Sequence, residues 1–184
     1  NSGLSDLLAW ATVSNVNGYG SFAAGDRVQF QRGNTWRESL WMPRAGSAGN
    51  LFGITAYGAG ALPIITGSDS ITGFSDGGSN IWDKAGFSTA VNVCAVAAYP
   101  TQLKKASRAA CTANGNWYYA AGTLSVYATS DPSGTVEAGQ RQYPVYVDTL
   151  AYIIIDSIQI QGSNELWLSG FYLRDSDHSI VSNC

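Results

Sequence analysis

Residues 151–170 read AYIIIDSIQIQGSNELWLSG and contain three short apolar runs, at 152–155, 158–160 and 166–168. Each run is followed within two residues by Asp, Gly or Ser. The runs are too short for helices and too closely spaced for ordinary hairpins, whose strands usually have about five or six residues. Strands this brief suit an architecture in which each apolar face is buried by stacking on its neighbours, because a single face cannot bury itself.

A repeat in the first third of the chain indicates how such strands are arranged. Val28, Leu40, Phe52 and Ile64 lie 12 residues apart, and turn-forming residues fill the gaps between them. Twelve residues is too short for a crossover through a helix. This spacing is compatible with an antiparallel meander. It fits better a repeating coil of about 24 residues in which each coil contributes two strands. Residues 152–158 also resemble residues 178–184 at an offset of 26, which favours stacked coils.

The predicted fold is therefore an all-β parallel β-helix, or solenoid, forming one domain over residues 1–184. Residues 4–16 have apolar positions at helical spacing and predict an amphipathic helix that caps the open end. First coils are expected over 20–68 and further coils over 144–184, with the chain continuing beyond Cys184. Residues 69–143 break the rhythm and predict an insertion with a β-hairpin, 117–119 against 124–127.

Composition excludes several classes of function. Charged residues make up 12% of the chain and the net charge is -3, so the sequence lacks the basic footprint of a nucleic-acid-binding protein. No run of 18 apolar residues is present, so no membrane span is expected. Low charge and many glycines are typical of extracellular β proteins. Of three cysteines, Cys94 and Cys111 could form a disulfide in an oxidising compartment, and no CxxC pair supports zinc.

The stretch AAGDRVQFQRGNTWRESLWMPRAGSAGNLFGITAYGAGALPIITGSD, residues 23–69, resembles the opening coils of right-handed parallel β-helix proteins of the pectate-lyase-like superfamily. The residues that carry the resemblance are Gly25, Asp26, Val28, Phe30, Gly33, Thr35, Trp36, Arg37, Glu38, Gly49, Asn50, Ala56, Tyr57, Gly58, Gly60, Pro63, Ile65 and Gly67. It extends over most of residues 20–184, with Leu-Phe-Gly at 51–53 where Pro-Ile is usual.

The resemblance implies a secreted or extracellular protein whose partner is a polysaccharide. Members of the superfamily include polysaccharide lyases, glycoside hydrolases, virus tailspikes and adhesins. One hypothesis is that the protein binds an extended glycan and cleaves it, as a lyase or hydrolase, through residues largely on later coils. The alternative is a non-catalytic tailspike, tail-fibre or adhesin module that binds host glycan at a virion or cell surface, as a homotrimer if it is a tailspike.

Candidate catalytic residues lie in the segment RDSDHS at 174–179. Asp175, Asp177 and His178, the only histidine, could perform general acid–base chemistry on a glycosidic bond. The competing interpretation, which is favoured, is a polar corner between strands, where Asp and Ser bond local backbone groups.

Candidate substrate-binding residues are cationic or aromatic. Lyase chemistry needs a cation to stabilise an enolate, and the cations considered are Lys104, Lys105, Arg108 and Arg141. The aromatic residues Trp117, Tyr118 and Tyr119 on the predicted hairpin could stack on sugar rings, as could Trp36 and Trp41. A solvated loop and packing between strands are the competing interpretations.

Calcium is considered as a cofactor, since Asp26, Asp148 and Asp156 adjoin predicted strands. The sequence contains neither an EF-hand nor a nonapeptide repeat, so no required metal is predicted.

Overall fold

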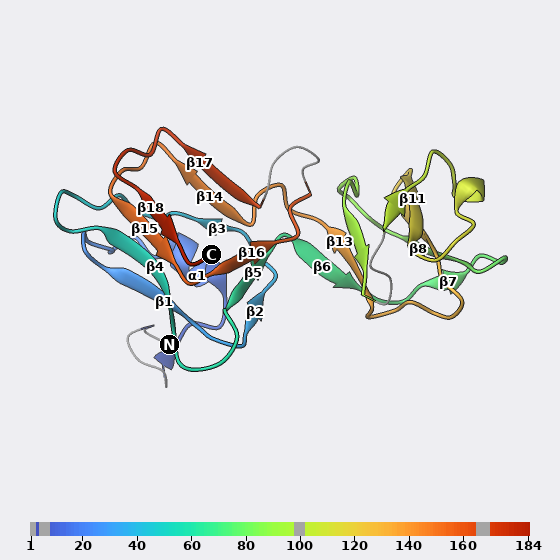
Figure 1. Ribbon diagram of the computed structural model, residues 1–184, viewed down its shortest axis with the longest axis horizontal. Helices are drawn as coiled ribbons and strands as arrows, with labels where there is room; N and C mark the ends of the chain where they lie inside the picture. Colours follow the sequence, from blue (N-terminus) through green and yellow to red (C-terminus); the bar gives the residue numbers. More distant parts are fainter. Residues whose placement is uncertain (1–2, 4–7, 98–101, 165–169) are drawn as a thin grey trace. The chain divides into compact units, whose positions relative to one another are not determined.

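The computed structural model describes residues 3, 8–97, 102–164 and 170–184, and nearly all of its regular structure is β (Figure 1). The chain forms two compact units. The first comprises residues 1–67, 143–161 and 168–184, and the second comprises residues 68–142 and 162–167. Among the described residues, no helix has the length and apolar character that crossing a membrane requires.

Among the described residues, the first unit contains one short α-helix and ten labelled strands placed in three sheets. These elements are α1 (Val13–Gly18), β1 (Arg27–Gln31), β2 (Thr35–Trp36), β3 (Leu40–Trp41), β4 (Phe52–Tyr57), β5 (Ile64–Thr66), β14 (Val145–Asp148), β15 (Ile153–Asp156), β16 (Gln159–Gln161), β17 (Phe171–Arg174) and β18 (Ile180–Ser182). The sheets have the strand orders β1-β4-β15-β18, β2-β5-β16 and β3-β14-β17.

Every strand pair in these three sheets is parallel. The chain visits the three sheets in a fixed order, β1 to β2 to β3, then returns to the first sheet at β4 and repeats the circuit. The second circuit runs from β4 and β5 to β14, so residues 68–142 lie in sequence between its second and third strands. Parallel pairing excludes the antiparallel meander for this unit.

The register agrees with the expected offset. Ile154 pairs with Ile180 and Asp156 with Ser182, each 26 residues apart. The same separation joins Val28 to Ile54 in β1 and β4. One circuit therefore takes 26 residues along the first sheet where no insertion intervenes.

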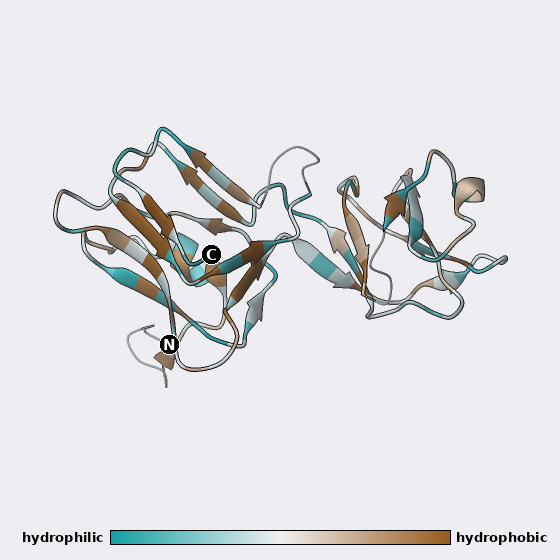
Figure 2. Cartoon of the chain, in the orientation of Figure 1, coloured by the Kyte–Doolittle hydropathy of each residue, from teal (hydrophilic) through white to brown (hydrophobic). Residues whose placement is uncertain are grey.

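Alternation along each strand places the core of the first unit between the sheets, because successive side chains of a strand point to opposite faces. Leu40, Ile54, Val145 and Ile155 are buried there, and apolar residues of the other strands join them in one cluster. Figure 2 shows the apolar residues concentrated on these strands. Gly46 is required at a turn beside this core, since a Cβ there would collide with the backbone of Tyr152 and Phe52.

The predicted helix over residues 4–16 is wrong in its bounds. Residues 4–7 lie outside the described residues, residues 9–12 are not helical, and α1 begins at Val13. Tertiary contacts explain this start: the Glu38 carboxylate accepts a hydrogen bond from the Ser14 N–H at 2.9 Å, which satisfies a free donor of the first turn. Val13 and Val16 are buried in the core cluster.

Helix α1 covers the edge of strand β3, as a capping helix should. The Asn17 side-chain amide donates to the Ser39 carbonyl at 2.8 Å, and its carbonyl oxygen accepts from the Trp41 N–H at 3.0 Å. These two bonds replace those that a neighbouring strand would make, so a side chain satisfies an otherwise open sheet edge.

The second unit contains β6 (Ser68–Ile71), β7 (Ser75–Asp76), β8 (Ile81–Ala85), β9 (Cys94–Val96), β10 (Leu103–Lys104), the 3-10 helix η2 (Arg108–Ala110), β11 (Asn116–Ala120), β12 (Thr123–Tyr127) and β13 (Val136–Gly139). They form the sheets β10-β11-β12-β8-β7 and β6-β13-β9. All of these pairs are antiparallel except β10 with β11.

The predicted hairpin is confirmed. Trp117 pairs with Val126 and Tyr119 with Leu124. Ala121 and Gly122 connect the strands with positive φ at both positions, as a two-residue type I′ turn requires. The core of this unit is a separate apolar cluster that includes Trp117, Leu124 and Val126.

Candidate functional site

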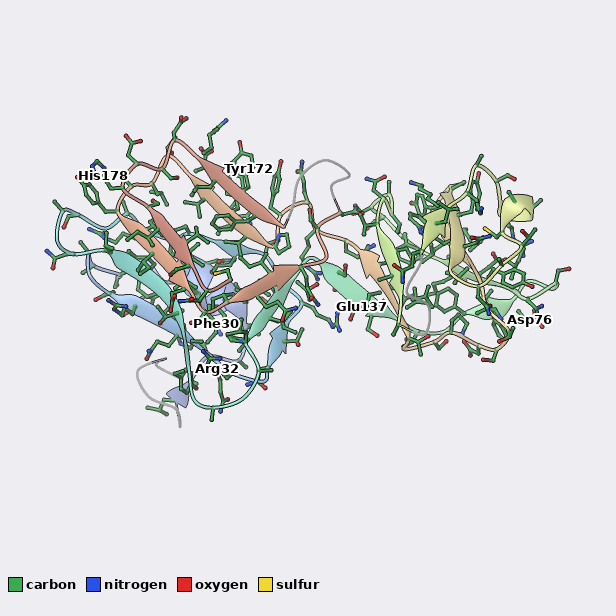
Figure 3. All side chains as sticks on the ribbon, viewed as in Figure 1. Phe30, Arg32, Asp76, Glu137, Tyr172 and His178 are labelled. Atoms are coloured by element: carbon green, nitrogen blue, oxygen red, sulfur yellow. The ribbon has the colours of Figure 1, made fainter. Side chains whose placement is uncertain are left out.

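The three candidate catalytic residues lie in the exposed turn between β17 and β18. Asp175, Asp177 and His178 are all exposed, and Asp175 and His178 have positive φ values. The Asp177 carbonyl accepts a hydrogen bond from the Tyr152 N–H at 3.0 Å, and the His178 ring stacks on Tyr152 with centroids 4.6 Å apart. Figure 3 shows the His178 side chain at this corner. These contacts to a neighbouring turn favour the interpretation of the segment as a polar corner between strands.

The aromatic residues of the hairpin do not share one surface. Trp117 is 4% exposed and belongs to the apolar core of the second unit. Tyr119 packs against the same core and its ring meets Phe87 edge-on, whereas Tyr118 is half-buried. A ring enclosed in the core cannot stack on a sugar. Because successive side chains of a strand alternate between faces, Tyr118 points to the face opposite Trp117 and Tyr119, and it is the one of the three that could contact a ligand.

The cationic candidates are dispersed within the second unit. Lys104 is exposed, with its ammonium 5.1 Å from the centre of the Trp117 ring and 3.3 Å from the Val91 carbonyl oxygen. Lys105 is half-buried, and Arg141 forms an ion pair with Asp69 at 2.7 Å. No one surface collects these cations.

Cys94 and Cys111 are free thiols in the structure, and both are buried. Burial raises the pKa of the Cys94 thiol to about 12, and it also raises the pKa of Cys111. Neither cysteine has the low pKa of a reactive nucleophile.

The three candidate calcium ligands are engaged with protein donors. Asp26 accepts from the Ala23 N–H at 2.7 Å. Asp156 accepts from the Ser182 hydroxyl and the Asn183 amide at 2.6 and 2.7 Å, contacts that lower its pKa. Within the described ranges, no three His, Cys, Asp or Glu residues are placed to hold a metal ion.

The strongest candidate site is a row of aromatic side chains on the outer face of the sheet β3-β14-β17. Trp41 of β3 pairs in register with Tyr146 of β14, and Tyr146 pairs with Tyr172 of β17. The flanking residues Leu40, Val145 and Val147 are buried in the core, so alternation turns the aromatic residues outward. Figure 3 shows Tyr172 pointing away from the core of this unit. We call Trp41, Tyr143, Tyr146 and Tyr172 the aromatic row.

The rings of the row differ in what they offer a ligand. Those of Tyr146 and Tyr172 are stacked, with centroids 4.9 Å apart and planes within 7°, and Tyr143 lies 4.7 Å from Tyr172. Tyr146 and Tyr172 therefore each cover one face of the other, and Tyr143 is tilted by 44° against Tyr172. Trp41 is tilted by 44° to Tyr146 at 5.8 Å and is 62% exposed, so its indole face is open to solvent.

A hydrogen-bonded ion pair lies beside the row. Arg174 donates to both carboxylate oxygens of Asp148, at 2.7 and 2.6 Å, and the Tyr146 hydroxyl donates to the same carboxylate at 2.9 Å. The bonds from Arg174, and then that from Tyr146, lower the pKa of Asp148. The same contacts raise the pKa values of Tyr146 and Arg174. The pair is neutral as a whole, and it fixes the orientation of the Tyr146 ring.

Most of this row was missed by sequence reasoning. From the sequence, Trp41 is considered for sugar stacking, Asp148 for calcium and Arg174 only as part of the RDSDHS segment, and neither Tyr146 nor Tyr172 is singled out. The signal was available in the 26-residue offset, which aligns VYVD at 145–148 with FYLR at 171–174. Applied to these segments, that offset pairs Tyr146 with Tyr172 and Asp148 with Arg174.

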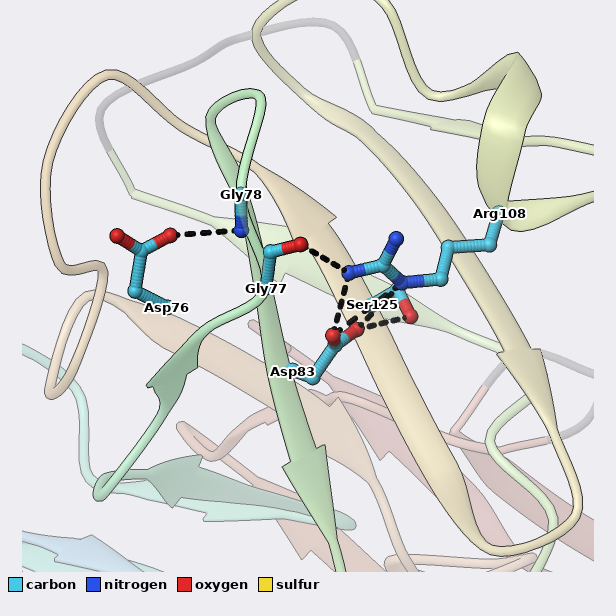
Figure 4. Close-up of polar contacts among 6 residues, drawn as sticks. All are labelled: Asp76, Gly77, Gly78, Asp83, Arg108 and Ser125. Carbon is cyan, nitrogen blue, oxygen red and sulfur yellow. Dashed lines mark hydrogen bonds and ion pairs between the residues drawn. The ribbon is translucent and has the colours of Figure 1, made fainter.

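A second polar cluster, in the second unit, has a structural role (Figure 4). Arg108 donates to Asp83 at 2.6 Å and to the Gly77 carbonyl at 3.0 Å, and the Ser125 hydroxyl donates to Asp83 at 2.6 Å. These contacts attach η2 to strands β8 and β12. The bond from Arg108 is the main cause of the lowered pKa of Asp83.

A hollow of about 990 Å³ lies beside the edge strands β1 and β2. Trp10, Phe22 and Trp36 are among the residues that line it, together with Asp26 and Glu38. Both carboxylates already accept backbone hydrogen bonds, from Ala23 and Ser14. We interpret this hollow as space left between the N-terminal residues and the strands of the first circuit, and we do not propose it as a ligand site.

Comparisons with known proteins bear on the fold. No family model matches the chain, and no curated protein matches it. A solved complex of XylC with xylose is similar in structure, with a TM-score of 0.68 and 15% sequence identity over 85% of this chain. The chain spans 33% of that XylC chain. A GH136 lacto-N-biosidase from Eubacterium ramulus aligns with a TM-score of 0.43 and 15% identity over 86% of this chain and 18% of its own. At this identity the XylC likeness concerns the fold alone.

Proposed function

We propose that the first unit is a right-handed parallel β-helix and that the protein binds an extended polysaccharide. Three parallel sheets visited in a repeating order support the β-helix, and the right-handed rule for connections between parallel strands supports its hand. The similarity in fold to a protein solved with xylose is consistent with a carbohydrate ligand.

The observation that carries the proposal is the aromatic row. An exposed indole is suited to a sugar ring, because the C–H face of a pyranose is apolar and the π-face of tryptophan is electron-rich. Trp41 provides such a face, while Tyr143, Tyr146 and Tyr172 extend away from it across the strands. The row therefore suits a glycan lying across the strands, with its first ring on Trp41 and its hydroxyls against the phenol edges.

The described residues favour binding over cleavage at this surface. Asp148 is held by Arg174 and its lowered pKa makes it a poor general acid at neutral pH. Asp175 lies 4.0 Å from the Arg174 guanidinium and is exposed, an environment unlike that of a glycosidase acid. These observations favour the non-catalytic candidate, an adhesin or tailspike module, whereas a cleaving enzyme would need Asp175, Asp177 or His178, or residues not described at this surface.

The test is to incubate the protein with a panel of neutral and acidic polysaccharides, and to measure retention in affinity gels and the products released. Retention that depends on Trp41 supports the proposed surface. Products absorbing in the ultraviolet would identify a lyase, new reducing ends without them a hydrolase, and neither product a binding module. Absence of retention by every polysaccharide in the panel would refute the glycan-binding proposal.

A further inference from the structure

The second unit contains a polar hollow of about 330 Å³ that no part of the aromatic row uses. It lies between the end of β6 with residue 72, the end of β8 with residues 86–88, and Gln140 after β13. Its volume is at the lower end of the range of about 300–1,000 Å³ found for small-molecule pockets. A single sugar-sized molecule is therefore the appropriate scale of ligand.

Lys84 enters this hollow from the core side of strand β8. It pairs directly with Leu124 of β12, which is fully buried, so both side chains leave the sheet on the same face. Asp83, the preceding residue, points to the opposite face and binds Arg108. The aliphatic part of Lys84 thus lies toward the core, and its ammonium reaches the hollow above Gly73, where a Cβ would lie 3.3 Å from it.

The Lys84 ammonium makes no hydrogen bond or ion pair with any residue that the structure describes. Lys84 itself is half-buried. The neighbouring carboxylate, Asp69, is instead neutralised by Arg141 at 2.7 Å. The residues that line the hollow thus include a lysine without a counter-ion and the hydroxyl-bearing residues Ser70, Thr72 and Ser88, together with the Asp69 that Arg141 pairs.

We propose that this hollow binds a sugar acid, with the carboxylate on the Lys84 ammonium and the ring hydroxyls on the surrounding serine and threonine side chains. A carboxylate supplies the missing counter-charge, and hydrogen bonds between oppositely charged groups are the stronger ones. The hydroxyl lining favours a polyhydroxylated ring over a simple anion, because a simple anion leaves those groups to water. This inference is independent of the glycan surface on the first unit.

The experiment is a titration of the whole protein with sodium glucuronate, followed by isothermal calorimetry or by NMR shifts of residues around Lys84. Glucose tests the need for charge, and sodium acetate and phosphate test the need for the sugar ring. We expect glucuronate to bind more tightly than each of these. We expect Lys84→Met, which keeps the aliphatic stem, to weaken glucuronate binding by about tenfold or more, and Lys84→Arg to retain part of it.

The matched control is Lys104→Met, which removes an exposed cation from the same unit, and it should leave glucuronate binding unchanged. Trp41→Ala should also leave it unchanged, which separates this site from the aromatic row. Circular dichroism confirms that each variant is folded. Glucuronate binding that is absent, that glucose or acetate equals, or that survives in Lys84→Met would each overturn the proposal.

Discussion

Trp41 is the single side chain on which the proposed glycan surface depends most. Its neighbours Leu40 and Met42 are buried, and its own backbone N–H is bonded to Asn17, so its outward direction is fixed from three sides. An apolar side chain of this size that is 62% exposed on a regular strand has no role in the core. Exposure on a rigid strand is the condition for a preorganised contact with a ligand.

Replacing Trp41 with Ala should weaken binding to the polysaccharide that the panel identifies by about thirtyfold, since loss of a central aromatic contact costs roughly 2 kcal/mol or more. Affinity electrophoresis measures the change. Tyr118→Ala removes a half-buried aromatic residue from the other unit and should have no effect. The reverse pattern, loss with Tyr118→Ala alone, would place the glycan on the hairpin instead.

Gly77 is the second residue with a strict requirement. A Cβ at this position would collide with the Arg108 guanidinium and the Asp83 carboxylate. Gly77→Ala should therefore separate that ion pair and destabilise the second unit by roughly 1–2 kcal/mol, the cost of a disrupted charged hydrogen bond. Urea denaturation measures the change.

Gly78→Ala is the neighbouring control for added bulk, because nothing lies within 4 Å of its Cβ position. Its positive φ introduces a modest strain of its own. Equal stability of Gly77→Ala and the native protein would contradict the packing seen here.

At the scale of elements, the hairpin and the capping helix illustrate different sources of information. The hairpin β11–β12 was predictable because β-rich runs flank a two-residue turn, and both signals are local. The start of α1 was not, because the groups that satisfy its first turn belong to Glu38, far along the chain. The prediction from apolar spacing alone included residues 9–12, which are not helical in the structure.

The cap itself can be tested through Asn17. Asn17→Ala removes both hydrogen bonds to strand β3, and we expect a loss of roughly 1–3 kcal/mol in the free energy of unfolding. Hydrogen exchange gives the local readout, since the Trp41 amide should lose protection. Asn15→Ala on the exposed side of the same helix serves as control, because its side chain bonds only Thr12. Unchanged protection of Trp41 in Asn17→Ala would argue against the edge-capping role.

At the scale of the whole molecule, the aspartates whose pKa values are shifted all change in one direction. The pKa values of Asp83, Asp131, Asp148 and Asp156 are all lowered from 3.8, through hydrogen bonds with arginine, serine or asparagine. A carboxyl group with a lower pKa in the folded state binds protons more readily when unfolded. Its contribution to stability is therefore complete above pH 3.8 and is lost as the pH falls through the folded value.

We expect the free energy of unfolding to be nearly constant between about pH 5 and 7 and to fall steadily below about pH 4. Urea denaturation at a series of pH values measures this directly. Asp83→Asn should reduce the acid-dependent part, because it removes one of the carboxyl groups whose pKa is lowered in the folded protein. Stability that increased on acidification would show that the carboxylates are not held as described.

Several features of this protein are determined by the sequence by itself: its all-β character, its short strands, the 26-residue offset and the hairpin. Each depends on neighbours or on a regular repeat, so alternation and turn chemistry reveal it. The tertiary structure alone decided which side chains meet across the insertion. The Ser39 hydroxyl donates to the Tyr143 carbonyl, 104 residues away, and the aromatic row forms because β14 pairs with β3 at a similar separation. No local pattern specifies that pairing, because it follows from backbone hydrogen bonds and core packing that exist only once the circuit has closed.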